Sequence, residues 1–126
     1  MTFVDMTDTS EESYSSWRLA LGKAITTFNS FFLDNGLDIK IREVSAGESK
    51  NDMVYYRNDE VNYAGMCRYY TENDYFSIYI NSSPYMAHGD NALKSTIVHE
   101  MGHLLGFPDS AYSLDDSLYS YSSDRN

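Results

Sequence analysis

The chain has 126 residues, the usual size of one domain and enough to bury a hydrophobic core without disulfide staples. Its 19 acidic and 9 basic residues give a formal net charge of −10, which argues against nucleic acid and anionic membranes as partners and favours neutral or cationic substrates. The single cysteine, Cys67, excludes a disulfide within the chain, and no apolar run is long enough for a transmembrane helix.

The first third of the chain predicts a strand, a long helix and a second strand. Residues 2–6 favour a short strand, and residues 14–33 an amphipathic helix. Residues 37–44 alternate apolar and charged side chains, which is typical of a half-buried strand. This order predicts a parallel strand pair with a right-handed crossover. The apolar positions of the helix, assigned to the core rather than to a binding face, are Trp17, Leu19, Ala20, Leu21, Ala24, Ile25, Phe28, Phe31 and Phe32.

The ends of this helix carry their own signals. A polar turn over 7–13 offers Thr9 or Ser10, followed by two acidic residues, as a helix N-terminus. Asn35-Gly36 is a stop signal, because glycine takes the left-handed conformation without a steric penalty.

The middle of the chain predicts three further strands. Residues 53–57 and 75–80 are β-prone, and 63–70 is β-prone but interrupted by Gly65, which indicates a bulge or a close backbone approach. We interpret Cys67, in the middle of that strand, as a buried small hydrophobic residue.

A second helix is expected over 91–105, with Asp90 or Asn91 as its cap. Two histidines, His99 and His103, lie four residues apart and therefore share one helix face. Two neutral imidazoles at this spacing can hold two corners of a tetrahedral zinc ion. The apolar residues expected to pack this helix on the sheet are Leu93, Ile97, Met101, Leu104 and Leu105.

The residues around the two histidines complete a catalytic zinc site. Glu100 lies beside the metal without occupying a ligand position, where it can act as the general base for a zinc-activated water. Gly106 is expected to end the helix and Pro108 to prevent its resumption, so that Asp109 can return to the metal as the third ligand. Two histidines and one carboxylate leave the fourth position open.

Two other interpretations of the histidine pair are possible. The histidines could merely share a helix face as exposed or hydrogen-bonded side chains, but the full pattern H-E-x-x-H-x-x-G-x-x-D over 99–109 favours zinc. In another class of zinc enzymes a glutamate from a later helix is the third ligand. No glutamate follows Asp109, so this class is excluded.

The segment His99-Glu100-Met101-Gly102-His103-Leu104-Leu105-Gly106-Phe107-Pro108-Asp109 resembles the metzincin zinc peptidases, and its terminal aspartate is most similar to the snapalysin family. The resemblance covers 91–121. It implies an α+β domain over 1–126, with a twisted, mostly parallel sheet, one antiparallel edge strand and two packed helices, the second carrying zinc. It also implies export from the cell.

The resemblance assigns further roles. In metzincins the antiparallel edge strand pairs with extended substrate, and here that edge is Tyr63-Ala64-Gly65-Met66, although an ordinary edge strand is an equal alternative. Residues 116–121 resemble the metzincin Met-turn, with Tyr119 where the family has methionine. Tyr121 corresponds to a tyrosine that, in some metzincins, donates a hydrogen bond to the transition-state oxyanion.

Two other features bear on metal binding. His88 lies outside the motif and is interpreted as a solvated loop residue. The acidic pairs Asp59-Glu60 and Asp115-Asp116 are the candidate positions for a structural calcium ion.

Together these features predict a secreted, monomeric zinc-dependent endopeptidase that acts on peptides or proteins, without nucleic acid or membrane partners. The alternative is a catalytically weak or inactive zinc-binding protein with a protein-interaction role, suggested by Tyr119.

The role of Asp109 can be tested through the pH dependence of zinc retention. A histidine ligand must lose a proton near ~6.5, whereas an aspartate is ionised above ~3.9. We therefore expect Asp109→His to bind zinc but to lose it more steeply than the parent on acidification, as followed by metal analysis after dialysis. If neither Asp109→His nor Asp109→Ala changes zinc affinity or its pH dependence, Asp109 is only a turn residue, and His88 becomes the next candidate ligand.

Overall fold

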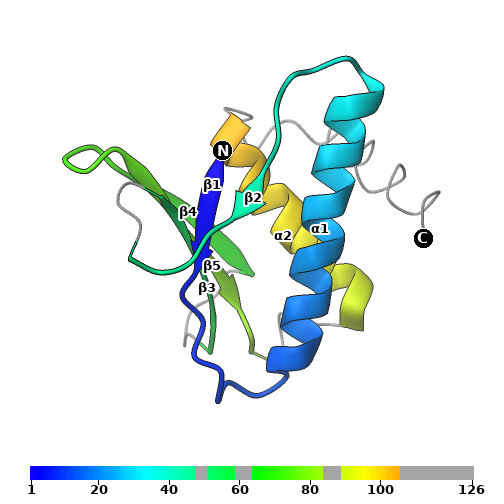
Figure 1. Cartoon of the computed structure of the whole chain (residues 1–126). Helices are drawn as coiled ribbons and strands as arrows, with labels where there is room; N and C mark the ends of the chain where they lie inside the picture. The colour runs from blue at the N-terminus through cyan, green and yellow to red at the C-terminus, as the bar shows by residue number, and fades with distance from the viewer. Residues whose placement is uncertain (48–50, 59–63, 84–88, 106–126) are drawn as a thin grey trace.

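The computed structural model describes residues 1–47, 51–58, 64–83 and 89–105. Along the chain, these ranges contain β1 (Thr2–Asp5), α1 (Tyr14–Asp34), β2 (Arg42–Glu43), β3 (Asp52–Arg57), β4 (Gly65–Tyr70), β5 (Tyr75–Asn81), α2 (Gly89–Gly102) and a closing 3₁₀ turn, η1 (His103–Leu105) (Figure 1).

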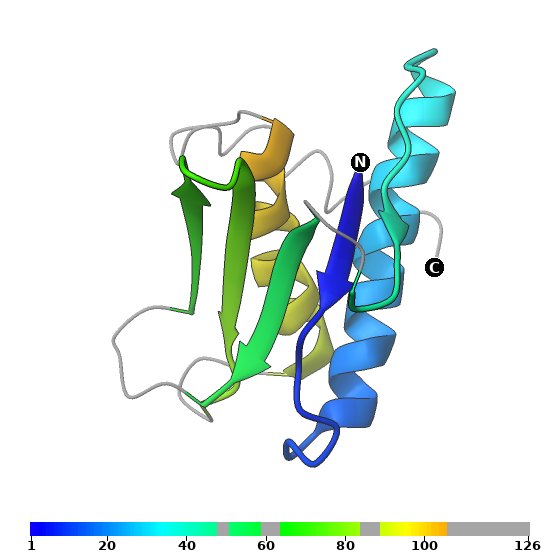
Figure 2. The same cartoon turned by 60° about the vertical axis from the view of Figure 1, so that its left-hand side comes forward.

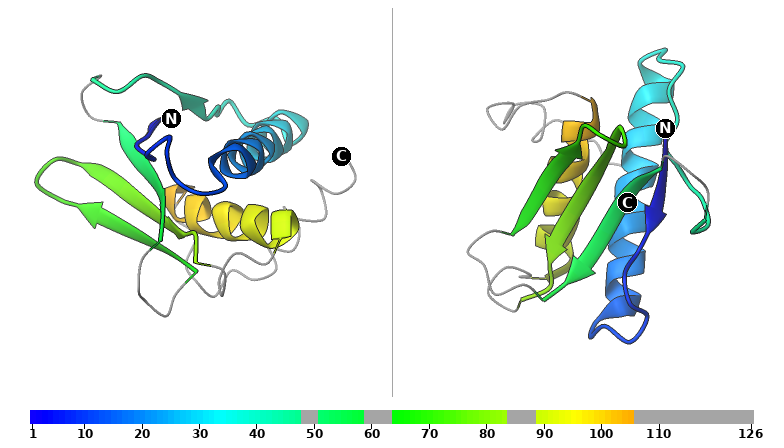
Figure 3. Two further views of the ribbon diagram at one scale, coloured as in Figure 1. Left: turned by 90° about the horizontal axis from the view of Figure 1, so that it is seen from below. Right: turned by 90° about the vertical axis from the view of Figure 1, so that its left-hand side faces the viewer.

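The five strands form one sheet in the order β2-β1-β3-β5-β4. All neighbouring pairs are parallel except β4 with β5, which is antiparallel. Both helices lie on one face of the sheet, behind the strands in Figure 2, and Figure 3 shows them side by side from below. The predicted α+β class, the mostly parallel sheet and the single antiparallel pair are confirmed.

The core lies between the sheet and the two helices. Trp17 of α1 is fully buried and stacks on Tyr56 of β3, with ring centroids 4.9 Å apart and an interplanar angle of 3°. Ile97 and Met101 bring α2 into the same cluster, which also contains Val54 of β3. Neither described helix is both long and apolar enough to cross a membrane.

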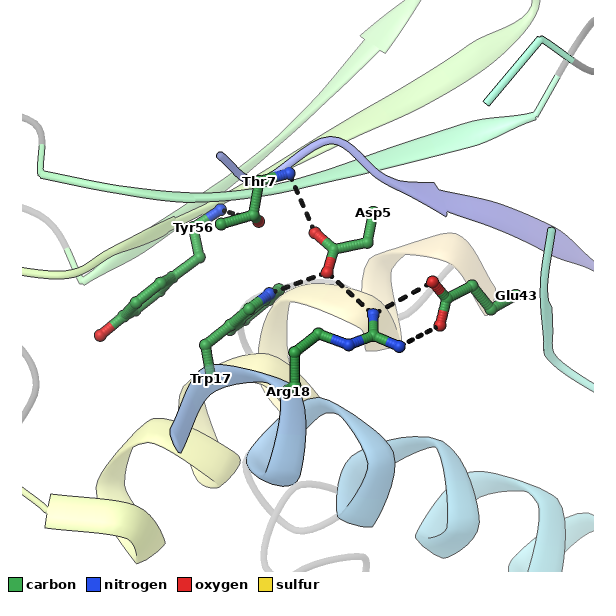
Figure 4. Close-up of polar contacts among 6 residues, drawn as sticks. All are labelled: Asp5, Thr7, Trp17, Arg18, Glu43 and Tyr56. Atoms are coloured by element: carbon green, nitrogen blue, oxygen red, sulfur yellow. Dashed lines mark hydrogen bonds and ion pairs between the residues drawn. The ribbon is translucent and has the colours of Figure 1, made fainter. Parts of the chain in front are cut away.

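A buried carboxylate joins β1 to α1. Asp5 accepts hydrogen bonds from the indole N–H of Trp17 at 3.0 Å, from the guanidinium of Arg18 at 2.9 Å and from the backbone N–H of Thr7 at 3.1 Å (Figure 4). Arg18 also forms a two-point ion pair with Glu43 of β2, at 2.7 and 3.0 Å. Together the two acids raise the pKa of Arg18, with the hydrogen bonds to Glu43 as the largest cause, so one cation ties three elements together.

The second predicted strand is shorter than expected. Only Arg42–Glu43 of the predicted 37–44 pairs with β1, while Leu37 and Ile39 are exposed. The prediction was wrong here because residues 37–40 lie beyond the N-terminal end of β1 and have no neighbouring strand among the described residues. The segment is held instead by Asn29 of α1, whose side-chain amide exchanges two hydrogen bonds with the backbone of Ile41, at 2.8 and 2.9 Å.

The helix starts also differ from the prediction. The N-cap of α1 is Ser13 rather than Thr9 or Ser10, because Asp8 accepts hydrogen bonds from the backbone and hydroxyl of Ser10 and thereby closes a separate turn. The α2 helix already begins at Gly89, so the predicted caps Asp90 and Asn91 lie inside its first turn. Within α1, Leu19 is 58% exposed and is not a core residue, because it lies off the stripe that faces the sheet and α2.

The Asp5 network provides a test of what holds the fold together. Asp5→Ala leaves the buried indole N–H of Trp17 without its acceptor and removes one of the two carboxylates that pair with Arg18, and we expect it to reduce the free energy of unfolding by about 3 kcal/mol. Glu43→Ala is the control: it removes the exposed partner of Arg18 and should cost less than about 1 kcal/mol. Urea unfolding measures both values. Equal losses in the two variants would contradict this account.

Candidate metal centre

The two histidines and Glu100 come from the C-terminal end of α2 and from the turn that follows it. The buried face of α2, with Leu93, Ile97 and Met101, fixes how the helix is rotated against the sheet. His99 and Glu100 belong to the last turn of this α-helix, and His103 is the first residue of η1. The predicted helical segment through 105 is confirmed, but its last turn is 3₁₀ rather than α. The expected stop at Gly106 lies outside the described residues.

Three side chains of the types that can bind a metal meet at this point. The ligand atoms of His99, Glu100 and His103 all lie within 4.8 Å of one another, so the group could hold a metal ion. The imidazole rings are 5.2 Å apart between centroids, at an interplanar angle of 87°. Glu100 is only 7% exposed, and both histidines are half-buried. The structure brings the histidine pair and Glu100 together as expected, while metal binding and the identity of the metal stay predictions.

The side chain of Glu100 packs directly against Gly65 of β4. A Cβ atom at Gly65 would lie 2.7 Å from Cγ of Glu100, 3.2 Å from its Cδ and 3.1 Å from the carbonyl oxygen of Tyr79. The pairing of β4 with β5 runs without interruption from Gly65↔Ile80 to Tyr70↔Tyr75, so there is no bulge. Of the two possibilities left by the sequence, the structure selects the close approach, and it identifies Glu100 as the neighbour.

The predicted substrate edge lies beside this cluster. β4 is the last strand of the sheet, antiparallel to β5, and no described strand pairs with its other side. Ala64 directly precedes β4, and its carbonyl oxygen accepts a hydrogen bond from the backbone N–H of Asn81 at 2.8 Å. Gly65 and Met66 are the first two residues of the strand. The edge position is thus confirmed for Gly65 and Met66, whereas substrate binding stays a prediction.

Cys67, which the sequence predicts to be a buried small hydrophobic residue, is also a neighbour of the site. It lies two residues after Gly65 on the same, helix-facing side of β4, where it is half-buried and packs against the core. Burial, and then the charges of Glu100 and Asp52, raise the pKa of the Cys67 thiol to about 12. The thiol is therefore protonated at neutral pH, as expected of a small core residue.

Several predicted positions lie outside the described residues. They are Tyr63 of the substrate edge, the third ligand Asp109, Tyr119 and Tyr121 of the resemblance to the Met-turn, His88, and both acidic pairs considered for calcium, Asp59-Glu60 and Asp115-Asp116.

Comparison with known proteins adds little to this geometry. No protein-family model and no curated protein matches the chain. Among solved structures, the chain is similar to a chain of the "GM1 bound form of the ECX AB5 holotoxin", with a TM-score of 0.46 and 14% identity over 83% of this chain. The match covers 50% of that chain, so the present chain spans about half its length. A likeness this distant carries no argument about function.

The state of Cys67 is directly measurable. At pH 8 its thiolate fraction is far below that of an ordinary cysteine, and the higher intrinsic reactivity of a high-pKa thiolate offsets only part of this difference. We expect a thiol reagent to label the folded protein roughly 10²-fold more slowly than the urea-unfolded chain. Labelling of the folded protein at the rate of a free thiol would show that Cys67 lies in a different environment.

Proposed function

We propose that the chain is a zinc-dependent endopeptidase, in which His99 and His103 bind zinc and Glu100 is the general base. The observation that supports this most strongly is the convergence of the three side chains, whose ligand atoms lie within 4.8 Å of one another beside an open sheet edge. The motif predicts Asp109 as the third ligand.

The donor set suits zinc. Imidazole nitrogen and carboxylate oxygen are both common zinc ligands, and the two histidines come from the last turn of α2 and the 3₁₀ turn that follows it directly, so the local backbone fixes their relative positions. Two histidines with one aspartate leave a position open, which distinguishes a catalytic from a structural zinc site. When bound, zinc would supply Lewis acidity that polarises the scissile carbonyl and lowers the pKa of the attacking water toward ~7.

Glu100 provides the proton transfers. Its carboxylate would accept the proton of the attacking water and then deliver it to the leaving amine, so that the peptide bond breaks without a free amide anion. A structural zinc site has no need of such a base. A buried carboxylate between the two imidazoles and the sheet edge therefore favours catalysis over the alternative of an inactive zinc-binding protein.

The edge strand offers a way to bind the substrate. An extended peptide can pair with the outer side of β4 through main-chain hydrogen bonds, which select for an extended conformation more than for sequence. Under this proposal Ala64, Gly65 and Met66, with Tyr63 before them, hold the peptide next to Glu100. Tyr121 is then the proposed donor to the developing oxyanion.

The proposal includes the finer assignments drawn from the resemblance. The domain is metzincin-like, with zinc on its second helix, and it acts on peptides or proteins outside the cell as a monomer.

The decisive variant is Glu100→Gln, which keeps the size of the side chain and removes its basicity. We expect cleavage of casein by the zinc-loaded protein to fall by about 10²–10⁴-fold, while metal analysis still finds one zinc per chain. His99→Ala should lose both zinc and cleavage, because it removes a ligand.

Glu72→Gln serves as the matched control, since it makes the same chemical change on an exposed residue of the β4–β5 turn. Its cleavage rate should equal that of the parent. If zinc is retained and Glu100→Gln cleaves as fast as the parent, Glu100 is not the base. If the parent binds zinc but cleaves no substrate, the non-catalytic alternative is correct.

A further inference from the structure

Gly65 has no room for a side chain, whereas its backbone conformation does not require glycine. Its φ angle lies outside the left-handed region that favours glycine, so alanine could adopt the same backbone. The space where its Cβ would lie is filled by Cγ of Glu100, at 2.7 Å, and is bounded by the carbonyl oxygen of Tyr79, at 3.1 Å. Glycine is therefore the residue that lets α2 approach β4 this closely.

Gly65 also lies where a bound peptide would pair. The backbone N–H of Asn81 donates to the carbonyl oxygen of Ala64, which marks these two residues as a hydrogen-bonded pair of the β4–β5 ladder. Since such pairs alternate along an antiparallel ladder, the following pair, Gly65 with Ile80, is of the other type. The N–H and C=O of Gly65 therefore point away from β5, toward the open side of β4.

We infer that Gly65 is the positioning residue for Glu100. Its missing side chain seats the carboxylate beside both imidazoles and directly behind the strand edge on which a peptide would lie. This inference rests on the proposed function and deepens it, because it makes one residue of β4 responsible for the place of the general base. A Cβ atom here must either rotate the Glu100 side chain out of the cluster or push β4 away from α2.

The first test compares Gly65→Ala with the parent, using the full chain loaded with zinc and casein as the substrate. A displacement of the base by about 1 Å should lower kcat roughly 10²-fold. Zinc content should remain at one per chain, because the three atoms nearest to the new methyl group belong to Glu100 and Tyr79 and not to a histidine. The control is Gly22→Ala in α1, where a Cβ atom meets nothing within 4 Å and kcat should not change.

The second test does not depend on activity. In the metal-free protein, Gly65→Ala should lower the thermal midpoint by about 5 °C or more, because the methyl group is forced against Glu100. In a Glu100→Ala background the Cγ and Cδ atoms are gone, so the same substitution should lower the midpoint by much less. A variant that folds only when Glu100→Ala is also present would be the strongest form of this coupling.

The two tests separate the inference from the proposed function. If Gly65→Ala keeps the parent kcat and lowers the midpoint equally in both backgrounds, Gly65 does not position Glu100, and the endopeptidase proposal stands. Failure to fold in both backgrounds likewise overturns the inference, since the defect then does not involve Glu100. If the parent binds zinc but cleaves nothing, the proposed function fails, and the thermal comparison alone decides whether Gly65 holds Glu100 in the cluster.

Discussion

The arrangement of the molecule depends on one buried carboxylate, that of Asp5. Its side chain is 4% exposed, and it accepts hydrogen bonds from Trp17 and Arg18 of α1. A carboxylate buried this deeply is tolerated only where donors surround it, so the bonds fix where α1 lies on the sheet. The α2 helix packs beside α1 on the same face of the sheet. The position of the site at the end of α2 therefore depends on where the Asp5 contacts hold α1.

At that far edge, α2 and β4 approach unusually closely. Glu100 lies on the helix face turned toward the sheet, where a longer side chain on β4 would hold the helix away. Gly65 removes the obstacle, and the antiparallel pairing with β5 keeps the strand in register beside it. His99 and His103 are half-buried, so part of each imidazole is accessible to solvent. Glu100, in contrast, is buried. The helix thus presents part of each imidazole to solvent and the carboxylate to the strand.

The sequence predicted the parts of this architecture that depend on local spacing. The amphipathic stripe of α1, the strand at β5 and the grouping of His99, Glu100 and His103 follow from local spacing, and the structure confirms all three. The features that it missed depend on contacts between distant residues. The length of β2 depends on where β1 starts, and the exposure of Leu19 depends on how α1 is rotated by Trp17 and Asp5. For Gly65, the sequence predicted part of the arrangement, because a glycine within a strand pattern indicates a bulge or a close backbone approach. Nothing in the local sequence identifies Glu100, 35 residues away, as the residue that approaches.

Gly65 and Glu100 are each unfavourable when considered alone. Glycine weakens a strand, because it has no side chain to pack and loses more backbone entropy on folding than any other residue. A glutamate on the buried face of a helix must bring its charge out of water, which costs free energy unless nearby donors or a cation compensate it. Here the side chain of Glu100 fills the space that Gly65 leaves, and together with the two imidazoles beside it this side chain could hold a metal cation. Locally unfavourable choices that coincide in space are typical of a functional site, because a fold selected for stability alone would have filled the same space with apolar side chains.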